Sequence, residues 1–141
     1  MSVEEVQDPR YVADHELRQQ GRAVRPKDAA TLLIVRRGGA EPRVLMGKRA
    51  ASHRFMPNKF VFPGGSVDPG DSRIRPPHDL HPQVLRRLCR GCSATRARAL
   101  ALAAIRETYE ETGLVVGEPD TPTLRSRSPA WADFLRHDAN P

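Results

Sequence analysis

Long apolar runs, aromatic side chains and cysteine are scarce in this sequence of 141 residues. No apolar segment approaches the ~20 residues that a membrane-spanning helix needs. Residues 1–10 are polar and acidic, without the apolar core of a secretory signal. We therefore expect a protein with no membrane partner, and a cytoplasmic location by default.

Cysteine occurs only as Cys89 and Cys92, a single Cys-x-x-Cys pair. Without a second pair or histidines at zinc spacing, the pair supplies half of a zinc site at best. A redox dithiol would be expected at the start of a helix after a strand, whereas this pair lies in a basic, irregular stretch. We interpret both residues as ordinary reduced thiols.

Aromatic residues make up 5% of the chain, and none alternates with arginines in the way that a stacking platform for bases requires. The net charge is +6, which favours anionic partners. A phosphate-rich small molecule fits this balance. Nucleic acid ranks last as a partner, because no recognition element accompanies the charge.

Apolar runs between glycines and prolines predict several strands. Residues 29–36 are a continuous branched apolar run, which predicts a buried strand, and residues 43–49 are its expected hairpin partner. Residues 60–62 predict a short strand that ends at Pro63-Gly64-Gly65. Residues 114–116 predict another.

The longest predicted element is a helix that ends at Thr112. Thr95 is its expected N-cap, and no glycine or proline interrupts the segment that follows. Gly113 stands where a left-handed residue ends a helix. Strands and helices together predict one domain of the α/β (α+β) class.

The remaining segments predict the organisation of the chain. Residues 1–28 are expected to be a polar arm, residues 29–117 the domain, and residues 72–94 an insertion rich in Pro, Arg and His. Residues 118–141 are expected to be a Pro/Ser-rich tail. The tail contains a short helix, predicted over Ala130–Arg136 from its Ser-Pro start.

Three carboxylates lie at the C-terminal end of the predicted helix, where the helix dipole opposes negative charge. Glu107 and Glu111 are four residues apart, Glu110 is within reach of both, and like charges at this spacing repel. Arg106 can pair with Glu110 and offset part of the repulsion. Mg²⁺ or Mn²⁺ could offset the rest, since hard cations take carboxylate oxygens. For the helix alone, a solvated acidic face is the alternative.

Gly64 and Gly65 follow a predicted strand directly, and Asp68 and Asp71 come soon after. Glycines allow a backbone to approach a ligand or metal closely. Alone, the glycines would indicate a tight turn. Together with the glutamate-rich helix, they favour a metal site.

The segment 106–114 resembles the second half of the Nudix box, Gly-x5-Glu-x7-Arg-Glu-U-x-Glu-Glu-x-Gly-U, where U is apolar. Residues 65–71 resemble the first half, with Asp71 where the family has its first Glu. About 27 residues are inserted between the two halves, and Thr108 replaces an aliphatic residue. Residues 49–68 are similar to the coenzyme A diphosphatase-like subgroup. The resemblance covers roughly residues 29–117.

This resemblance implies a Nudix-type α/β/α sandwich around a mixed sheet. It also implies hydrolysis of a nucleoside diphosphate linked to another group, such as coenzyme A or acyl-CoA. The implied cofactor is Mg²⁺ or Mn²⁺, and charge stabilisation and activation of water are its roles. Carried over by position, the implied metal ligands are Gly65 through its carbonyl, Asp71, Glu107, Glu110 and Glu111.

The resemblance gives Arg106 the role of orienting a glutamate, so the implied catalytic set is Arg106, Glu107, Glu110 and Glu111. The general base stays open, with Glu110 as one candidate. Arg49, Arg54 and Lys59 precede the glycines and are expected to bind substrate phosphates. The alternative for this basic loop is simple solvation.

The family fold needs strands and a helix after the box, and this sequence has 24 residues beyond Gly117. We therefore expect a fragment or a truncated member, incomplete at its C-terminal end. A catalytically inactive Nudix-like nucleotide-binding module stays open as the alternative function, followed by a basic nucleic-acid-binding protein. The oligomeric state is also open.

Overall fold

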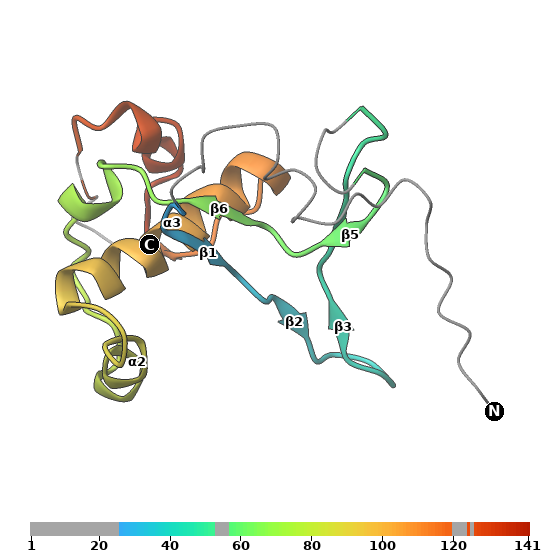
Figure 1. The fold of residues 1–141 in the computed structure, drawn as a ribbon, viewed down its shortest axis with the longest axis horizontal. Coiled ribbons are helices and arrows are strands. Elements are labelled where there is room, and N and C mark those ends of the chain that lie inside the picture. The colour runs from blue at the N-terminus through green and yellow to red at the C-terminus, as the bar shows by residue number, and fades with distance from the viewer. Residues whose placement is uncertain (1–25, 53–56, 120–123, 125) are drawn as a thin grey trace, which may run out of the picture.

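The computed structural model describes residues 26–52, 57–119, 124 and 126–141 and combines short strands with helices (Figure 1). Its strands are β1 Ala29–Thr31, β2 Val35–Arg36, β3 Arg43–Val44, β4 Gly47–Lys48, β5 Phe60–Val61, β6 Gly64–Ser66, β7 Glu118–Pro119 and β8 Ala139–Asn140. Its helices are α2 Pro82–Leu88 and α3 Ala94–Thr112, with 3-10 turns at Asp71–Arg73, Pro129–Trp131 and Phe134–His137. The α+β class predicted from the sequence is confirmed.

The first six strands form three antiparallel pairs: β1 with β6, β2 with β3, and β4 with β5. A fourth antiparallel pair joins β7 to β8. In Figure 1, β1 and β6 lie over α3, whereas β2 and β3 project away from the helical part of the molecule. Parallel pairing, which a mixed sheet requires, does not occur among the described strands.

The continuous buried strand predicted over residues 29–36 is wrong in two respects. It is divided into β1 and β2, because Pro63 lies opposite Leu32 and interrupts the hydrogen bonding between the strands. Leu32 N donates to the Pro63 carbonyl over 3.0 Å, but proline has no N–H with which to donate back to Leu32. It is also not buried, since Leu33 is 61% exposed. The expected hairpin is present as the antiparallel pairing of β2 with β3, in which Val35 lies opposite Val44.

The glycines after Pro63 lie in strand β6, where a tight loop was the simpler expectation. Gly64 has a φ of 151°, and a β-carbon there would lie 2.3 Å from the Ala30 carbonyl oxygen. Glycine is required at this position because β1 and β6 approach so closely.

Helix α3 ends as predicted. Gly113 adopts a left-handed φ of 71°, and its N–H donates to the Tyr109 carbonyl over 2.7 Å. The predicted N-cap Thr95 is wrong: the helix is capped by Ser93, whose Oγ accepts from Arg96 N at 3.3 Å. The strand predicted over residues 114–116 is wrong, because no described strand pairs with this segment after the helix ends. The next strand in the chain is β7, which pairs with β8.

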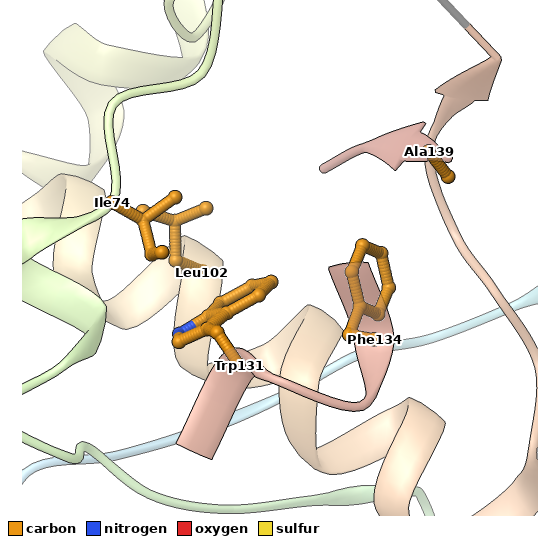
Figure 2. Packing of buried hydrophobic residues seen from close by; sticks show 5 residues of the cluster. All are labelled: Ile74, Leu102, Trp131, Phe134 and Ala139. Carbon is orange, nitrogen blue, oxygen red and sulfur yellow. The ribbon is translucent and has the colours of Figure 1, made fainter. Parts of the chain in front are cut away.

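The hydrophobic core combines three segments that are distant in the sequence. Figure 2 shows Ile74 and Leu102 beside Trp131, with Phe134 and Ala139 further along. The rings of Trp131 and Phe134 meet edge to face with centroids 5.2 Å apart. Residues predicted to be insertion and tail therefore supply much of the core. The short helix predicted over Ala130–Arg136 is instead two 3-10 turns.

The insertion packs onto the rest of the molecule through α2, which lies against α3. An exposed ion pair from Arg98 to Asp79, 2.6 Å long, links α3 to the same segment. Cys89 and Cys92 are free and half-buried. In the described part of the chain, none of the helices has the length and apolarity needed to cross a bilayer.

Candidate active site

Arg106 lies at the centre of the predicted site and is almost fully buried between α3 and β6. Its Nη1 donates to Glu107 Oε1 at 3.0 Å and to both Glu110 oxygens at 3.1 Å. Its Nε and Nη2 donate to the two oxygens of Asp71 at 2.9 and 3.2 Å. Nη2 also reaches the Ser66 carbonyl at 2.9 Å. One guanidinium therefore fixes the helix end, the strand and the 3-10 turn together.

Burial by itself would lower the pKa of Arg106, because it disfavours the charged form. The hydrogen bonds that Arg106 donates to Asp71 and Glu110 outweigh this effect and raise its pKa above the usual value. Arg106 is therefore a permanent cation at the site.

Asp71 is completely buried, and both of its carboxylate oxygens are hydrogen-bonded. Oδ1 accepts from Arg106 Nε and from Trp131 Nε1 at 2.8 Å, whereas Oδ2 accepts from Arg106 Nη2 and from the Asp68 amide at 2.8 Å. The sequence predicted Asp71 as a metal ligand. In the structure it is the bidentate partner of Arg106, an arrangement that fixes the guanidinium plane.

Glu107 and Gly65 lie in direct contact. A β-carbon on Gly65 would lie 2.4 Å from the Glu107 carboxyl carbon and from its Oε2. Non-bonded atoms do not approach this closely, so the carboxylate occupies the space that a side chain at residue 65 would fill. The glycine thereby allows the carboxylate to lie directly on the backbone of β6.

Glu110 and Glu111 are exposed and have different partners. Glu110 pairs with Arg106 one helical turn earlier, and its side chain is 44% exposed. Glu111 Oε2 accepts from the Gly64 amide at 3.1 Å. Glu107 and Glu111 thus contact the strand Gly64–Ser66, and Glu110 is linked to it through Arg106.

The donor chemistry fits a hard divalent cation, because carboxylate oxygens surround a backbone cradle that has no β-carbon. In the structure, Glu107 and Glu110 share Arg106 as their partner, whereas Glu111 accepts from the Gly64 amide. Within the described ranges, no three His, Cys, Asp or Glu side chains converge closely enough to hold a metal.

Two of the three predicted phosphate-binding residues lie side by side. Arg49 N donates to the Lys59 carbonyl at 2.9 Å, next to the β4–β5 pair. Lys59 is exposed, and Arg49 is half-buried. Arg54 lies outside the described residues.

Two further groups of this site were not predicted from the sequence. The Ser66 carbonyl accepts from Arg106, and the Trp131 indole donates to Asp71 from 60 residues away. Trp131 is the only tryptophan in the chain, which is the one signal that could have directed attention to it.

Comparison with known proteins shows likenesses to Nudix hydrolases, while no family model matches the sequence. A Caenorhabditis elegans protein named "Putative nudix hydrolase 7" is 34% identical over 73 residues, which are 52% of this chain and 17% of that protein. A crystal structure of a NUDIX hydrolase from Alicyclobacillus acidocaldarius superposes with a TM-score of 0.51 at 31% identity, over 73% of this chain and 44% of that one. This chain therefore spans less than half the length of either protein. Both likenesses support the Nudix hydrolase family, and the solved structure supports the fold.

Proposed function

We propose that this chain belongs to the Nudix hydrolases and carries out metal-dependent hydrolysis of a nucleoside diphosphate linked to another moiety. The observation that carries the proposal is the arrangement around Arg106. A single buried cation holds Glu107 and Glu110 beside the glycine strand and is itself fixed by Asp71.

In this proposal, Glu107 and Glu111 are the principal metal ligands, with Glu110 as a third and the Gly65 carbonyl as a backbone ligand. When bound, Mg²⁺ or Mn²⁺ would neutralise phosphate charge and lower the pKa of a bound water. We assign Asp71 the role of positioning Arg106, because both of its carboxylate oxygens already accept hydrogen bonds from protein donors.

Arg106 positions Glu107 and Glu110 and does not touch substrate, since its donors all face protein oxygens. Glu110 is the more exposed of these two glutamates and is the candidate general base. It accepts a proton from the attacking water only if its carboxylate turns from Arg106 towards substrate.

The proposed substrate is a phosphate-rich nucleotide conjugate of the coenzyme A or acyl-CoA type. Support comes from the net charge of +6 and from the basic residues Arg49, Arg54 and Lys59 that precede β6. An extra phosphate on the nucleotide would increase the electrostatic attraction to such a surface.

The test is an activity assay with Mg²⁺ or Mn²⁺ and a panel of coenzyme A, acyl-CoA, ADP-ribose and NADH, followed by detection of phosphomonoester products. Glu107→Gln and Glu111→Gln keep side-chain size but remove a charged ligand. We expect each to lower kcat by at least ~10²-fold, because metal charge stabilisation contributes several kcal/mol. Glu41→Gln, the same change in an exposed loop, is the matched control. Absence of product from every substrate, with folded protein, would contradict the proposal.

A nucleotide-binding module without turnover is the second candidate, and it is favoured because no three carboxylates converge to hold a metal among the described residues. Tight nucleotide binding that yields no product and is unaffected by Glu111→Gln would support this alternative. Equilibrium dialysis with the same panel of nucleotides measures it.

A further inference from the structure

The segment 128–137 packs against the 3-10 turn that carries Asp71. Gly70 immediately precedes that turn, and a β-carbon on Gly70 would collide with the Ser128 hydroxyl oxygen. Three residues later, the Trp131 indole Nε1 donates to Asp71 Oδ1 at 2.8 Å. Both of these side chains are fully buried, so solvent does not reach the hydrogen bond between them. The segment therefore supplies a donor to a carboxylate of the candidate active site.

The same segment is attached to helix α3 at Tyr109, which lies among the glutamates in the sequence. The Tyr109 hydroxyl donates to Asp133 Oδ2 at 2.7 Å. It also lies 2.8 Å from His137 Nε2, within hydrogen-bonding distance. Trp131 is thus held between two attachments, one before it at Ser128 and one after it at Asp133 and His137.

The hydrophobic core restricts the orientation of the Trp131 ring. Figure 2 shows the ring beside Ile74 and Leu102, with Phe134 further along. The rings of Trp131 and Phe134 are inclined at 76° to each other, in edge-to-face contact. Close packing of this kind holds a side chain in one rotamer. The indole N–H therefore meets Asp71 from a fixed direction.

The Trp131 indole is one of two donors to Asp71 Oδ1, and the other is Arg106 Nε at 2.9 Å. Without the indole N–H, this oxygen would keep the guanidinium alone. Water would not replace the missing donor, because Asp71 is fully buried. A carboxylate with fewer donors is held less firmly in its plane, and the bidentate pair with Arg106 depends on that plane.

Arg106 carries the orientation of Asp71 to the glutamates. Its Nη1 donates to Glu107 and Glu110, while its Nη2 donates to Asp71 and to the Ser66 carbonyl. Because the guanidinium group is planar and rigid, a tilt at Nε also moves Nη1. The positions of both glutamate carboxylates therefore depend on the plane of the Asp71 carboxylate.

We infer that Trp131 is a positioning residue of the candidate active site, which acts through Asp71 and Arg106 on Glu107 and Glu110. The inference rests on the proposed function, because these glutamates are the proposed metal ligands. Trp131 touches neither metal nor substrate. Groups that orient a metal ligand from outside the coordination shell typically contribute about 10–100-fold to metal affinity or activity.

The indole N–H can be removed with almost no change of shape. Because Trp131 is the only tryptophan in the chain, biosynthetic incorporation of benzothienylalanine in place of tryptophan alters this residue alone. The analogue keeps the bicyclic ring and has sulfur where tryptophan has N–H. Trp131→Phe is the genetically encoded counterpart. Phe134→Leu is the matched control, since it perturbs the same aromatic pair without removing a donor to Asp71.

The first measurement is the rate at which the Arg106 guanidinium rotates, from NMR line shapes of its N–H groups in the metal-free full chain. Arg106→Lys identifies the signals. We expect rotation about tenfold faster in the benzothienylalanine protein and in Trp131→Phe, because the carboxylate that holds the guanidinium has lost a donor. Phe134→Leu should leave the rate unchanged. The exposed Arg98, bound to Asp79, is an internal control that should not respond.

The second measurement is Mn²⁺ binding by electron paramagnetic resonance, at a temperature where circular dichroism shows every protein to be folded. We expect the benzothienylalanine protein and Trp131→Phe to bind Mn²⁺ about tenfold more weakly than the unaltered protein. Phe134→Leu should keep the unaltered affinity. A role of Trp131 in stability alone would not move the affinity of folded protein.

Equal rotation rates of Arg106 in the unaltered and benzothienylalanine proteins would overturn the inference. So would an equal change in Phe134→Leu, which would make Trp131 a core residue only. Unchanged Mn²⁺ affinity in the folded benzothienylalanine protein would overturn it as well. Failure of the unaltered protein to bind Mn²⁺ or to hydrolyse any nucleotide would instead contradict the proposed function, and the rotation rates would still decide whether Trp131 positions Arg106.

Discussion

Gly65 illustrates how the absence of a single β-carbon makes room for a carboxylate of the candidate site. The Glu107 carboxylate occupies the space where that atom would stand and is held there by Arg106. Two residues more than forty positions apart in the sequence are thus matched in shape as well as in charge.

At the residue scale, we first predict that Gly65→Ala displaces Glu107 and weakens Mn²⁺ binding at least tenfold, with a loss of ~1–3 kcal/mol in the free energy of unfolding. Gly47→Ala is the control, because a β-carbon at that strand position meets no atom within 4 Å. Electron paramagnetic resonance measures free Mn²⁺, and urea unfolding measures stability. Equal effects of the two substitutions would contradict this role of Gly65.

A second residue-scale prediction concerns the buried ion pair. Asp71→Asn removes the charge that faces Arg106 and should destabilise the protein by about 3 kcal/mol, because a buried cation loses its principal partner. Asp79→Asn removes an exposed partner of Arg98 and should cost much less, because solvent screens a surface ion pair. Urea unfolding at neutral pH compares the two variants, and similar losses would refute a special role for Asp71.

The sequence predicted the types of residue in the candidate site better than their contacts. Glu107, Glu110 and Arg106 lie close together on one helix, so local spacing was enough to group them. The contact between Trp131 and Asp71 depends on a long-range path of the chain that no local pattern records.

At the scale of elements, helix α3 was the most predictable part of the chain. Its C-terminal end at Gly113 follows from the tolerance of glycine for a left-handed φ. Its start differed by two residues because Ser93 and Thr95 are both good N-caps, and sequence alone does not decide between them.

We predict that Ser93→Ala lowers the free energy of unfolding by about 1 kcal/mol, because the Arg96 amide loses its acceptor. Thr95→Ala should change it by less than ~0.5 kcal/mol, since the Thr95 side chain caps nothing. Thermal unfolding followed by circular dichroism distinguishes the two. A larger loss for Thr95→Ala would mean that the helix begins later.

The strands were less predictable than the helix. The run 29–36 has the composition of one buried strand, but Pro63 interrupts its ladder, and Leu33 and Val35 are exposed. An apolar composition predicts that a strand is buried. Whether it is buried depends on which other segments pack against it.

At the scale of the whole molecule, the core depends on segments that the sequence did not identify as core-forming. Trp131 and Phe134 come from the expected tail and Ile74 from the expected insertion. Ile74 is a single apolar residue between arginines, and the segment that holds Trp131 and Phe134 is too short for a clear periodicity, so no pattern marked these residues as buried.

The attachment of the insertion to α3 should depend on acidity. A hydrogen bond from Arg98 lowers the pKa of Asp79 to about 2, against an ordinary value of 3.8. Because the folded-state pKa is the lower one, the stabilisation is complete above pH ~4 and is lost as the pH falls towards about 2. Asp79→Asn should flatten the dependence of the urea midpoint on pH in this window, and Glu41→Gln should not. An unchanged profile in Asp79→Asn would show that the ion pair does not couple folding to pH.

The central claim is that the glutamates around Arg106 and Gly65 form a divalent-cation site. The most direct measurement is Mn²⁺ binding, followed by electron paramagnetic resonance, in the unaltered protein and in Glu107→Gln, Glu111→Gln and Glu41→Gln. We predict one saturable site that is lost in the first two variants and retained in the third. Equal Mn²⁺ affinity in the folded Glu107→Gln, Glu111→Gln and unaltered proteins would contradict the claim.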